Sequence, residues 1–368
     1  MVLAKRTEGR KNDHLEICLK ENVQSRRVTT GFEELNLVHK ALPEINRRKI
    51  NLSTKVLNHK FSAPLIVESM TGGTPRATKI NAAMARAVEK LGLGMGVGSQ
   101  RAAVEDPKVE RTFRIARDEA PNAFIIANIG APQLARGYGV KEARKAVEML
   151  EADALAVHLN PLQEAIQPEG ETSYVGVVDA IEKIVKGLDV PVIVKETGCG
   201  IAAAEAKQLE AIGVAAIDVA GAGGTSWAAV EYYRAKRQVD ESRQRLGETF
   251  WDWGIPTAAS LIEVTKRVRI PVIASGGLRS GIDVAKALAL GASLVGMAYP
   301  ILGPAVHGAE GVEKKLQLVI EELRNTMFLV GADSVQNLKN VPVIVTGKTA
   351  DWLTMRGFEP QIYARRGL

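Results

Sequence analysis

The chain has 368 residues, 46% of them hydrophobic, with a formal net charge of +6 and two cysteines, Cys18 and Cys199. We expect neither a membrane span, because the apolar runs are far shorter than roughly 20 residues, nor a secretory signal, because the N-terminus is polar. Two distant cysteines suit a reducing cytoplasm better than a disulfide framework or a zinc site, and scattered basic residues without interleaved aromatics predict an anionic small molecule, not a nucleic acid, as partner.

From residue 63 onward, short apolar runs alternate with amphipathic stretches that have the 3.6-residue rhythm of helices. The predicted strands are residues 64–70, 94–98, 123–128, 154–159, 191–195, 215–220, 270–275 and 293–298. The predicted helices are residues 76–91, 111–119, 141–151, 175–188, 202–212, 282–290 and 310–330. Strands that are apolar throughout have both faces buried, and eight such units predict a closed (β/α)₈ TIM barrel of the α/β class. A doubly wound open sheet is the alternative, but its GxGxxG fingerprint is missing.

Three segments frame this barrel. Residues 1–62 form an N-terminal extension, with a short helix and strand pieces, that we expect to contribute to the substrate site. The barrel spans residues 63–335, and residues 336–368 form a C-terminal tail without a motif. Residues 227–253, after the sixth strand, are expected to form a long loop. Long loops at a barrel mouth are usually lids or binding loops, and packing between subunits is an equally weighted alternative.

Polar or glycine-rich residues occur at every predicted strand end. In chain order they are residues 69–73, 98–101, 128, 158–164, 195–196, 221–226, 275–277 and 297–298. The active site of this fold is built from the carboxyl ends of the strands, so this distribution predicts an enzyme. Gly276-Gly277, Met297-Ala298 and residues 223–226 lie where barrel phosphate sites form, because backbone N–H groups and helix N-termini favour anions.

Lys195 ends a strand that otherwise reads Val-Ile-Val. A lysine inside a barrel is uncommon without a partner. Its ammonium group suits the N1 and O2 edge of a flavin, where it would stabilise the negative charge of the reduced ring. A Schiff-base lysine is the competing chemical interpretation, and an ion pair with Glu196 or Asp218 is the structural one.

The segment His158–Glu164 offers a histidine, two amides and a carboxylate. Glu164 has the chemistry to hold a Mg²⁺ ion that bridges a diphosphate, or to compensate a helix dipole. His158 is either functional or a buried core histidine. Arg10-Lys11 and Arg101 are candidate diphosphate clamps, because arginine binds phosphate in a bidentate manner; the alternative for the first pair is a solvated basic terminus.

These segments together resemble the type 2 isopentenyl diphosphate isomerases. The resemblance runs from about residue 10 to about residue 332, in order and at similar spacing. Its motifs are RKNDH at 10–14, MTGG at 70–73, GSQR at 98–101, HLNPLQE at 158–164, VKE at 194–196, VAGAGGTSW at 219–227 and ASGG at 274–277. NPLQE and AGAGGTSW are the most diagnostic.

The resemblance implies an enzyme that interconverts isopentenyl and dimethylallyl diphosphate by a 1,3-proton shift, with reduced FMN as acid and base. FMN would contact Met70, Thr71, Gly72, Ser99, Asn128, Lys195, Thr225, Gly276, Gly277, Met297 and Ala298. The diphosphate would meet Arg10, Lys11, Ser99, Gln100, Arg101, His158, Asn160 and Gln163. The catalytic residues would be Gln163, Lys195, His158 and Trp227, with Glu164 holding Mg²⁺. NADPH as electron donor and a homo-tetramer or homo-octamer are also implied.

Two other functions remain open from the sequence. One is an FMN-dependent oxidase or dehydrogenase of 2-hydroxy acids, which needs a base histidine and an arginine late in the barrel. The chain offers Arg279 there but no histidine before His307, which disfavours it. The other is a non-catalytic flavin- or phosphate-binding assembly protein, which the polar residues at all eight strand ends disfavour.

Overall fold

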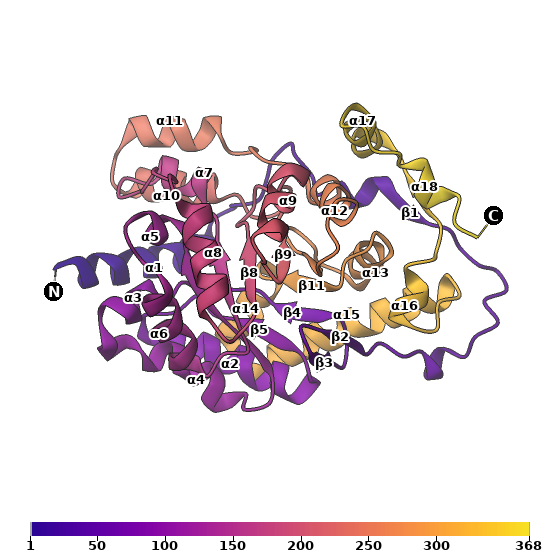
Figure 1. The fold of residues 1–368 in the computed structure, drawn as a ribbon, viewed down its shortest axis with the longest axis horizontal. Helices are drawn as coiled ribbons and strands as arrows, with labels where there is room; N and C mark the ends of the chain where they lie inside the picture. Colours follow the sequence, from indigo (N-terminus) through magenta and orange to yellow (C-terminus); the bar gives the residue numbers. More distant parts are fainter. Residues whose placement is uncertain (1, 368) are drawn as a thin grey trace.

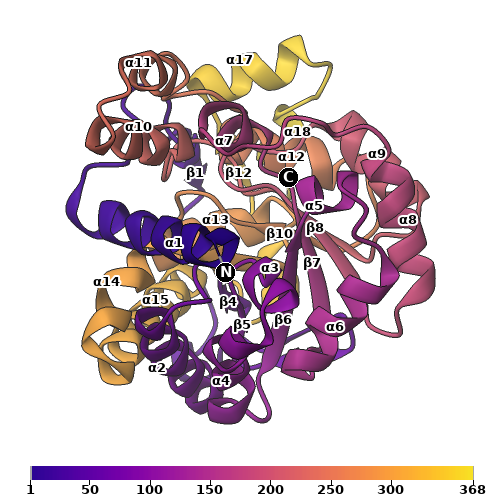
Figure 2. The ribbon, with the colours of Figure 1, turned by 90° about the vertical axis from the view of Figure 1, so that its left-hand side faces the viewer.

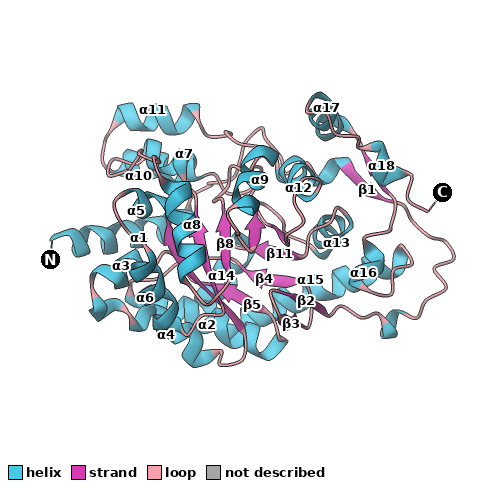
Figure 3. Ribbon diagram, viewed as in Figure 1, coloured by secondary structure: helices cyan, strands magenta, loops and turns pink. Residues whose placement is uncertain are grey.

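The computed structural model describes residues 2–367, with side chains from residue 9 onward. Its centre is a closed barrel of eight parallel strands that follow one another around the barrel in chain order (Figure 3). The strands are β4 (Leu65–Val67), β5 (Gly94–Gly96), β6 (Phe124–Gly130), β7 (Ala154–His158), β8 (Val192–Lys195), β9 (Ala216–Asp218), β10 (Val272–Ala274) and β11 (Leu294–Met297). The (β/α)₈ barrel predicted from the sequence is therefore confirmed.

Helices surround the barrel (Figure 1). Those that follow the strands in turn are α2 (Pro75–Leu91), α4 (Arg111–Glu119), α6 (Val140–Leu150), α8 (Val177–Gly187), α9 (Ala203–Ala211), α12 (Thr257–Thr265), α13 (Gly281–Ala289) and α15 (Ala309–Leu329). Shorter helices occupy several strand ends: α3 (Arg101–Glu105), α5 (Ala131–Ala135), α7 (Pro161–Ile166) and α14 (Tyr299–His307). The described residues also form three short 3-10 helices: η1 (Phe32–Glu34), η2 (Arg47–Lys49) and η3 (Pro107–Val109).

Two apolar layers hold the barrel together. Side chains alternate along a strand, so Leu65 and Val67 pack outward against the helices while Ile66 belongs to a separate inner cluster. A hairpin of β2 (Thr54–Val56) and β3 (His59–Phe61) joins this inner cluster. The ring of Phe61 packs edge-to-face on that of Phe124, with centroids 5.4 Å apart. The hairpin therefore closes the amino-terminal end and leaves the carboxyl end for the site.

The segment after β9 is helical, so the loop predicted over residues 227–253 is wrong. It forms α10 (Trp227–Arg237) and α11 (Glu241–Thr249), which pack on each other. Both helices start at a side-chain cap: Ser226 accepts from the N–H of Ala229, and Asp240 from that of Arg243. Such caps satisfy the free N–H groups of a first turn. Ser226 and Asp240 were therefore the local sequence signal for these two helices.

The N-terminal extension begins with helix α1 (Val2–Lys20), longer than the short helix expected. Figure 2 shows α1 crossing in front of the barrel mouth. Further along, β1 (Leu35–Leu37) pairs antiparallel with β12 (Val343–Val345). The C-terminal segment also contains α16 (Val335–Leu338), α17 (Gly347–Met355) and α18 (Gln361–Ala364). Among residues 2–367, no helix has both the length and the apolar character that a bilayer-crossing segment needs.

Candidate active site

A cavity opens at the carboxyl ends of the strands, under helix α1. The barrel lines it with Glu68, Ser69, Met70, Thr71, Gly98, Ser99, Lys195, Thr197, Gly221, Thr225, Ser275, Gly276, Gly277, Arg279, Ala298 and Tyr299, among others. Helix α10 adds Trp227, and α1 adds Lys11, His14, Leu15 and Cys18. Residues from Glu68 to Ala298 thus share one cavity, because the carboxyl ends of the parallel strands meet at one end of the barrel.

Most residues assigned to FMN from the sequence line this cavity. They are Met70, Thr71, Ser99, Lys195, Thr225, Gly276, Gly277 and Ala298. Gly72, Asn128 and Met297 lie behind its wall. A Cβ atom on Gly72 would come within 1.9 Å of the Phe113 ring, and Met297 packs in the core outside the barrel. Any contact of Gly72 or Met297 with a ligand must therefore be through the backbone.

Glycines at the ends of β9 and β10 pack backbone against backbone. A Cβ atom on Gly224 would lie 2.5 Å from the backbone of Gly277, and one on Gly276 would lie 2.3 Å from the carbonyl oxygen of Gly221. Gly276 and Gly277 have φ values of 98° and 80°, a region that suits glycine. No hydrogen bond within residues 2–367 uses their two N–H groups. This glycine cradle suits a phosphate, which backbone N–H groups bind well.

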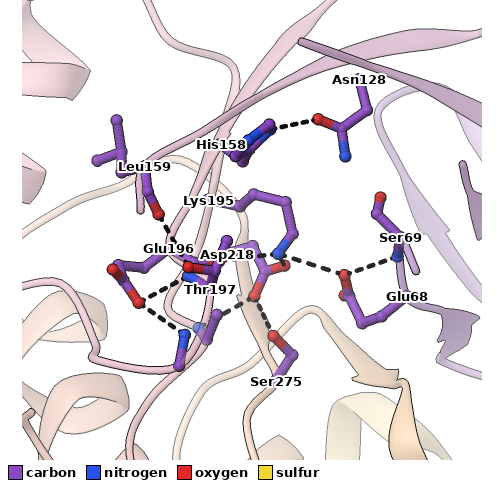
Figure 4. A network of polar contacts seen from close by, with 12 residues as sticks. Glu68, Ser69, Asn128, His158, Leu159, Lys195, Glu196, Thr197, Asp218 and Ser275 are labelled. Carbon is purple, nitrogen blue, oxygen red and sulfur yellow. Dashed lines mark hydrogen bonds and ion pairs between the residues drawn. The ribbon is translucent and has the colours of Figure 1, made fainter. Parts of the chain in front are cut away.

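Lys195 lies on the floor of the cavity between two carboxyl groups (Figure 4). Its Nζ atom is 3.6 Å from both Glu68 Oε2 and Asp218 Oδ2, and it donates to the carbonyl oxygen of Glu196 at 2.8 Å. Burial opposes its charge, but Asp218 and Glu68 outweigh burial and raise the pKa of Lys195 above its usual value. The structural ion pair weighed for Lys195 therefore exists with Asp218, whereas Glu196 contributes only its backbone oxygen.

Glu68 was missed from the sequence. It directly follows β4 and is 6% exposed. Burial first, and then the Asp218 carboxylate, raise the pKa of Glu68 to about 8 against the opposing effect of Lys195. A charged residue at the end of the apolar run Leu-Ile-Val was the available signal, the same signal that singled out Lys195.

His158, at the end of β7, is half-buried beside Lys195. Burial, followed by the positive charge of Lys195, lowers the pKa of His158 to about 3, so the ring is neutral at pH 7. Its Nδ1 atom is 2.7 Å from the Oδ1 atom of Asn128, whose own amide donates to the carbonyl oxygen of Val97. Because an amide oxygen only accepts, Nδ1 carries the proton and Nε2 keeps a free lone pair. His158 can therefore accept a hydrogen bond at Nε2 but has no proton to donate there.

Three basic residues gather where α1 meets the end of β5. The Nζ atom of Lys11 donates to the carbonyl oxygen of Ser99 at 2.9 Å. Burial, then the charges of Arg10 and Arg101, lower the pKa of Lys11 to about 7. Arg101 has the exposed Glu105 as a partner at 2.8 Å. Half-buried cations that repel one another in this way form a site for a multiply charged anion.

Gln100 does not belong to this cluster, although the sequence assigned it to the substrate. Its side chain is completely buried. The amide nitrogen donates to the carbonyl oxygen of Ala146 on α6, and the amide oxygen accepts from the N–H of Asn128 on β6. The side chain therefore braces the end of β5 against its neighbours and lines no part of the cavity.

The predicted diphosphate ligands Asn160 and Gln163 lie at the start of helix α7 and are hydrogen-bonded to each other. The amide of Asn160 donates to Gln163 Oε1 at 3.2 Å and to Glu164 Oε1 at 2.9 Å. Glu164 Oε2 accepts from the N–H of Glu171. Within the described residues, no three His, Cys, Asp or Glu side chains form a metal-binding group. A carboxylate has about four lone-pair positions, so Glu164 retains capacity for a Mg²⁺ ion whose other ligands are phosphate and water.

Helix α10 contributes one side chain to the cavity lining and a second one just behind it. Trp227 lines the cavity and meets His14 of α1 edge-to-face, with ring centroids 5.2 Å apart. Glu231 is 1% exposed and accepts from the Nε2 atom of Gln163 at 3.1 Å. His14 and Glu231 were not assigned from the sequence. Glu231 falls in the segment predicted to be a loop. The sequence around it therefore did not indicate that it lies on a helix and faces α1.

A parallel (β/α)₈ barrel with a glycine cradle after β10 and a buried lysine facing the same cavity belongs to the class of FMN-binding barrels. A profile of the FMN-dependent dehydrogenase family matches residues 4–115 and 140–344. The chain is a flavoprotein of that family.

Two relatives narrow this class. The isopentenyl-diphosphate delta-isomerase of Methanosarcina barkeri is 52% identical over 361 residues, 98% of each chain. That of Methanothermobacter thermautotrophicus is 54% identical over 357 residues, 97% of this chain and 99% of the relative. The chain belongs to the isopentenyl-diphosphate delta-isomerase family, as the motifs had indicated.

Solved structures agree with the fold. A flavocytochrome b2 variant with sulfite bound superimposes with a TM-score of 0.65 at 21% identity, over 89% of this chain and 81% of that one. A mandelate oxidase variant with (S)-mandelic acid gives a TM-score of 0.63 at 17% identity, over 94% of this chain and 98% of that one. These likenesses bear on the barrel architecture and not on the reaction.

Proposed function

We propose that this protein interconverts isopentenyl diphosphate and dimethylallyl diphosphate on a bound, reduced FMN. The observation that carries the proposal is the set of residues that line the cavity under α1. It combines the glycine cradle and Lys195, which suit a flavin, with Lys11 and apolar side chains from α1, which suit a small anionic ester. The family membership of the chain supports the same reaction.

In this proposal, one group of cavity residues binds the phosphate of FMN and another group faces its ring. Gly276, Gly277 and Ala298 offer backbone N–H groups for the phosphate, with Thr225 beside them. Lys195, Ser99 and the segment around Thr71 face the part of the cavity left for the ring. When bound and reduced, FMN supplies the acid and base group that moves the proton between substrate carbons. The task of Lys195 is to place a positive charge where that ring is electron-rich.

The diphosphate end of the substrate is assigned to Arg10, Lys11 and Arg101, with Gln163 as a neutral donor and Asn160 beside it. An anion there would relieve the repulsion that lowers the pKa of Lys11. The hydrocarbon end is assigned to Leu15, Cys18 and Trp227, which give the cavity an apolar wall. Such a wall excludes water, and the face of Trp227 stabilises positive charge that develops on carbon.

Two of the predicted catalytic side chains, Gln163 and His158, act through hydrogen bonds in this proposal. The Gln163 amide is fixed between Asn160 and Glu231, so it orients a proton donor or the substrate. His158 presents a free Nε2 lone pair and serves as an acceptor. Glu164 would hold a Mg²⁺ ion that bridges the diphosphate.

The remaining assignments extend the same proposal. NADPH would deliver the electrons that reduce FMN, by transient binding at the open face of the cavity. The protein would work in the cytoplasm as a homo-tetramer or homo-octamer. Exposed apolar side chains such as Trp352, Met355 and Ile362, on the C-terminal helices, are available for contacts between subunits.

An anaerobic assay tests the proposal. The purified protein is given FMN, a chemical reductant, Mg²⁺ and isopentenyl diphosphate in D₂O, and the products are followed by NMR. We expect dimethylallyl diphosphate with deuterium at the exchanged carbons, and loss of conversion when FMN is left out. A protein that stays colourless with FMN, or that instead makes peroxide from 2-hydroxy acids in air, would contradict the proposal.

A further inference from the structure

The floor of the cavity contains more negative groups than positive ones. Glu68 and Asp218 both approach the one ammonium group of Lys195 at 3.6 Å. All three residues are at most 8% exposed. Two carboxylates against a single buried cation leave one negative charge without a counter-charge, and an uncompensated buried charge is costly.

The surroundings of the two carboxyl groups differ. Asp218 Oδ1 accepts from Ser275 Oγ at 2.6 Å and from the N–H of Ala220 at 3.2 Å, which suits an ionised carboxylate. Glu68 receives only the N–H of Ser69, at 3.4 Å. Its Oε1 atom is buried without a hydrogen-bond partner among the described residues. Of the two groups, Glu68 is therefore the one that holds a proton.

Two ionisable groups act on Glu68 directly, Lys195 on β8 and Asp218 at the end of β9. Glu196 and neutral His158 lie beside Lys195. The same cavity is also lined by Lys11, His14, Cys18, Arg279 and Tyr299. The neighbouring strand β11 presents Gly296, where a Cβ atom would lie 2.0 Å from Glu68 Oε1. The absence of a side chain at Gly296 makes the space that the glutamate occupies.

We propose that Glu68 is a positioning residue that keeps one proton on the Glu68–Asp218 pair and so holds the Lys195 site at zero net charge beside the flavin. The inference rests on the proposed function, in which Lys195 faces the reduced ring. Burial and the Asp218 carboxylate raise the pKa of Glu68 to about 8. Above that pH, ionised Glu68 adds a negative charge next to Lys195 and disfavours a negative charge on the ring.

The infrared spectrum of the apoprotein tests the proton without FMN. We expect a carbonyl-stretch band of a protonated carboxylic acid at pH 7 that disappears as the pH rises through about 8. Glu68→Gln should lose this band. Asp218→Asn should lose it as well, because Glu68 then becomes the sole counter-ion of Lys195 and ionises. The agreement of two different substitutions keeps the test valid if one variant folds poorly.

Two control variants separate this band from other carboxyl groups. Burial raises the pKa of Glu196 to about 7, so Glu196→Gln should remove a different band and retain that of Glu68. Glu205→Gln, on the outside of α9, should change neither band nor activity. If the band that titrates near pH 8 survives in Glu68→Gln, the proposed proton is not on Glu68 and the inference is overturned.

The midpoint potential of bound FMN tests the consequence for the flavin. In the parent protein, the potential should begin to fall more steeply with pH near pH 8, because reduction then takes up an additional proton on Glu68. Glu68→Gln should lack this break, while Glu205→Gln should keep it. A break that persists in Glu68→Gln would refute the role of Glu68. A protein that shows the infrared band but binds no FMN would instead contradict the proposed function.

Discussion

The Nε2 atom of His14 lies 2.9 Å from the Oε1 atom of Glu231, and this contact joins helix α1 to helix α10 over the cavity. Glu231 also forms an ion pair with Arg234 at 2.6 Å and accepts from Gln163 on α7. One buried carboxylate thus connects three helices at the mouth. The geometry of the substrate site therefore depends on the charge of a residue that lines no part of the cavity.

Replacing Glu231 by Gln should destabilise the protein in a pH-dependent way. Burial opposes the charge, but His14, Arg234 and Gln163 outweigh burial and lower the pKa of Glu231 to about 2. A group with a lowered folded-state pKa stabilises the fold above its unfolded value and loses this effect as pH falls. We expect Glu231→Gln to cost roughly 3 kcal/mol at pH 7 and much less near pH 2. Urea unfolding at several pH values measures this, with exposed Glu241→Gln as the control; equal losses at both pH extremes would contradict it.

Pyrophosphate should bind more weakly as the pH rises above about 7, where Lys11 loses its proton in the free protein. Below that pH the lysine is already charged, and above it binding must take up a proton. The affinity should then fall by up to about tenfold per pH unit. Lys11→Ala should bind more weakly at pH 6 and lose this dependence, whereas exposed Lys141→Ala should behave as the parent. Calorimetry with inorganic pyrophosphate and Mg²⁺ provides the measurement, and an unchanged pH profile in Lys11→Ala would rule out the assignment.

Removing the ammonium group of Lys195 should alter both the fold and the flavin. Glu68 and Asp218 would lose the cation that lies 3.6 Å from each, and a broken buried pair costs about 3–5 kcal/mol. We expect Lys195→Met to show a lowered flavin midpoint potential and an isomerisation rate reduced by at least about a hundredfold. In Lys195→Arg, which keeps the charge, the flavin midpoint potential should stay close to that of the parent protein, whereas the isomerisation rate should fall further. A Lys195→Met protein with full rate and parent potential would exclude the role given to Lys195.

The glycine cradle should not tolerate a methyl group. A Cβ atom on Gly224 would lie 2.5 Å from the backbone of Gly277, so Gly224→Ala must push the two strand ends apart. The expected result is an FMN dissociation constant raised at least about tenfold, equivalent to about 1.4 kcal/mol. Gly303→Ala is the matched control, because nothing lies within 4 Å of a Cβ atom there. Quenching of FMN fluorescence on binding compares the variants, and similar affinities for both would argue against a phosphate in the cradle.

Glu164→Gln should raise the Mg²⁺ concentration needed for half-maximal rate by about tenfold or more. The amide is almost isosteric and can still accept from Glu171 N–H, so the helix should remain folded. It lacks the negative charge that a hard cation prefers. Titration of the rate with Mg²⁺ is the readout, and thermal unfolding checks that the fold is intact. An unchanged Mg²⁺ requirement would remove Glu164 from the metal site.

Much of this architecture could be predicted because its signals are local. The apolar strands and the residues that follow them are contiguous in sequence, and parallel strands of a barrel necessarily bring their carboxyl ends together. Lys195 and Gly277 therefore reach one cavity without any knowledge of packing. The strand ends β4 to β11 and most predicted FMN residues follow from this rule.

The residues that escaped prediction depend on contacts between distant segments. Glu231 matters because α1 folds back onto α10, and the sequence of α10 alone does not show which partner it meets. Glu68 matters because β4, β8 and β9 point three charged side chains at one place. Gln100 shows the reverse case, since a motif position that resembles a ligand is occupied with hydrogen bonds to α6 and β6.

The pairing of β1 with β12 has a consequence for the order in which the chain folds. Leu35 lies opposite Val345, so β1 emerges from the ribosome long before its partner exists. Until β12 has been synthesised, the backbone N–H and C=O groups of β1 lack their partner strand. Such an exposed strand edge promotes aggregation. Contacts so distant in sequence also slow folding. A tag or truncation near β12 should therefore lower the yield of folded protein during expression even though β12 lines no part of the cavity.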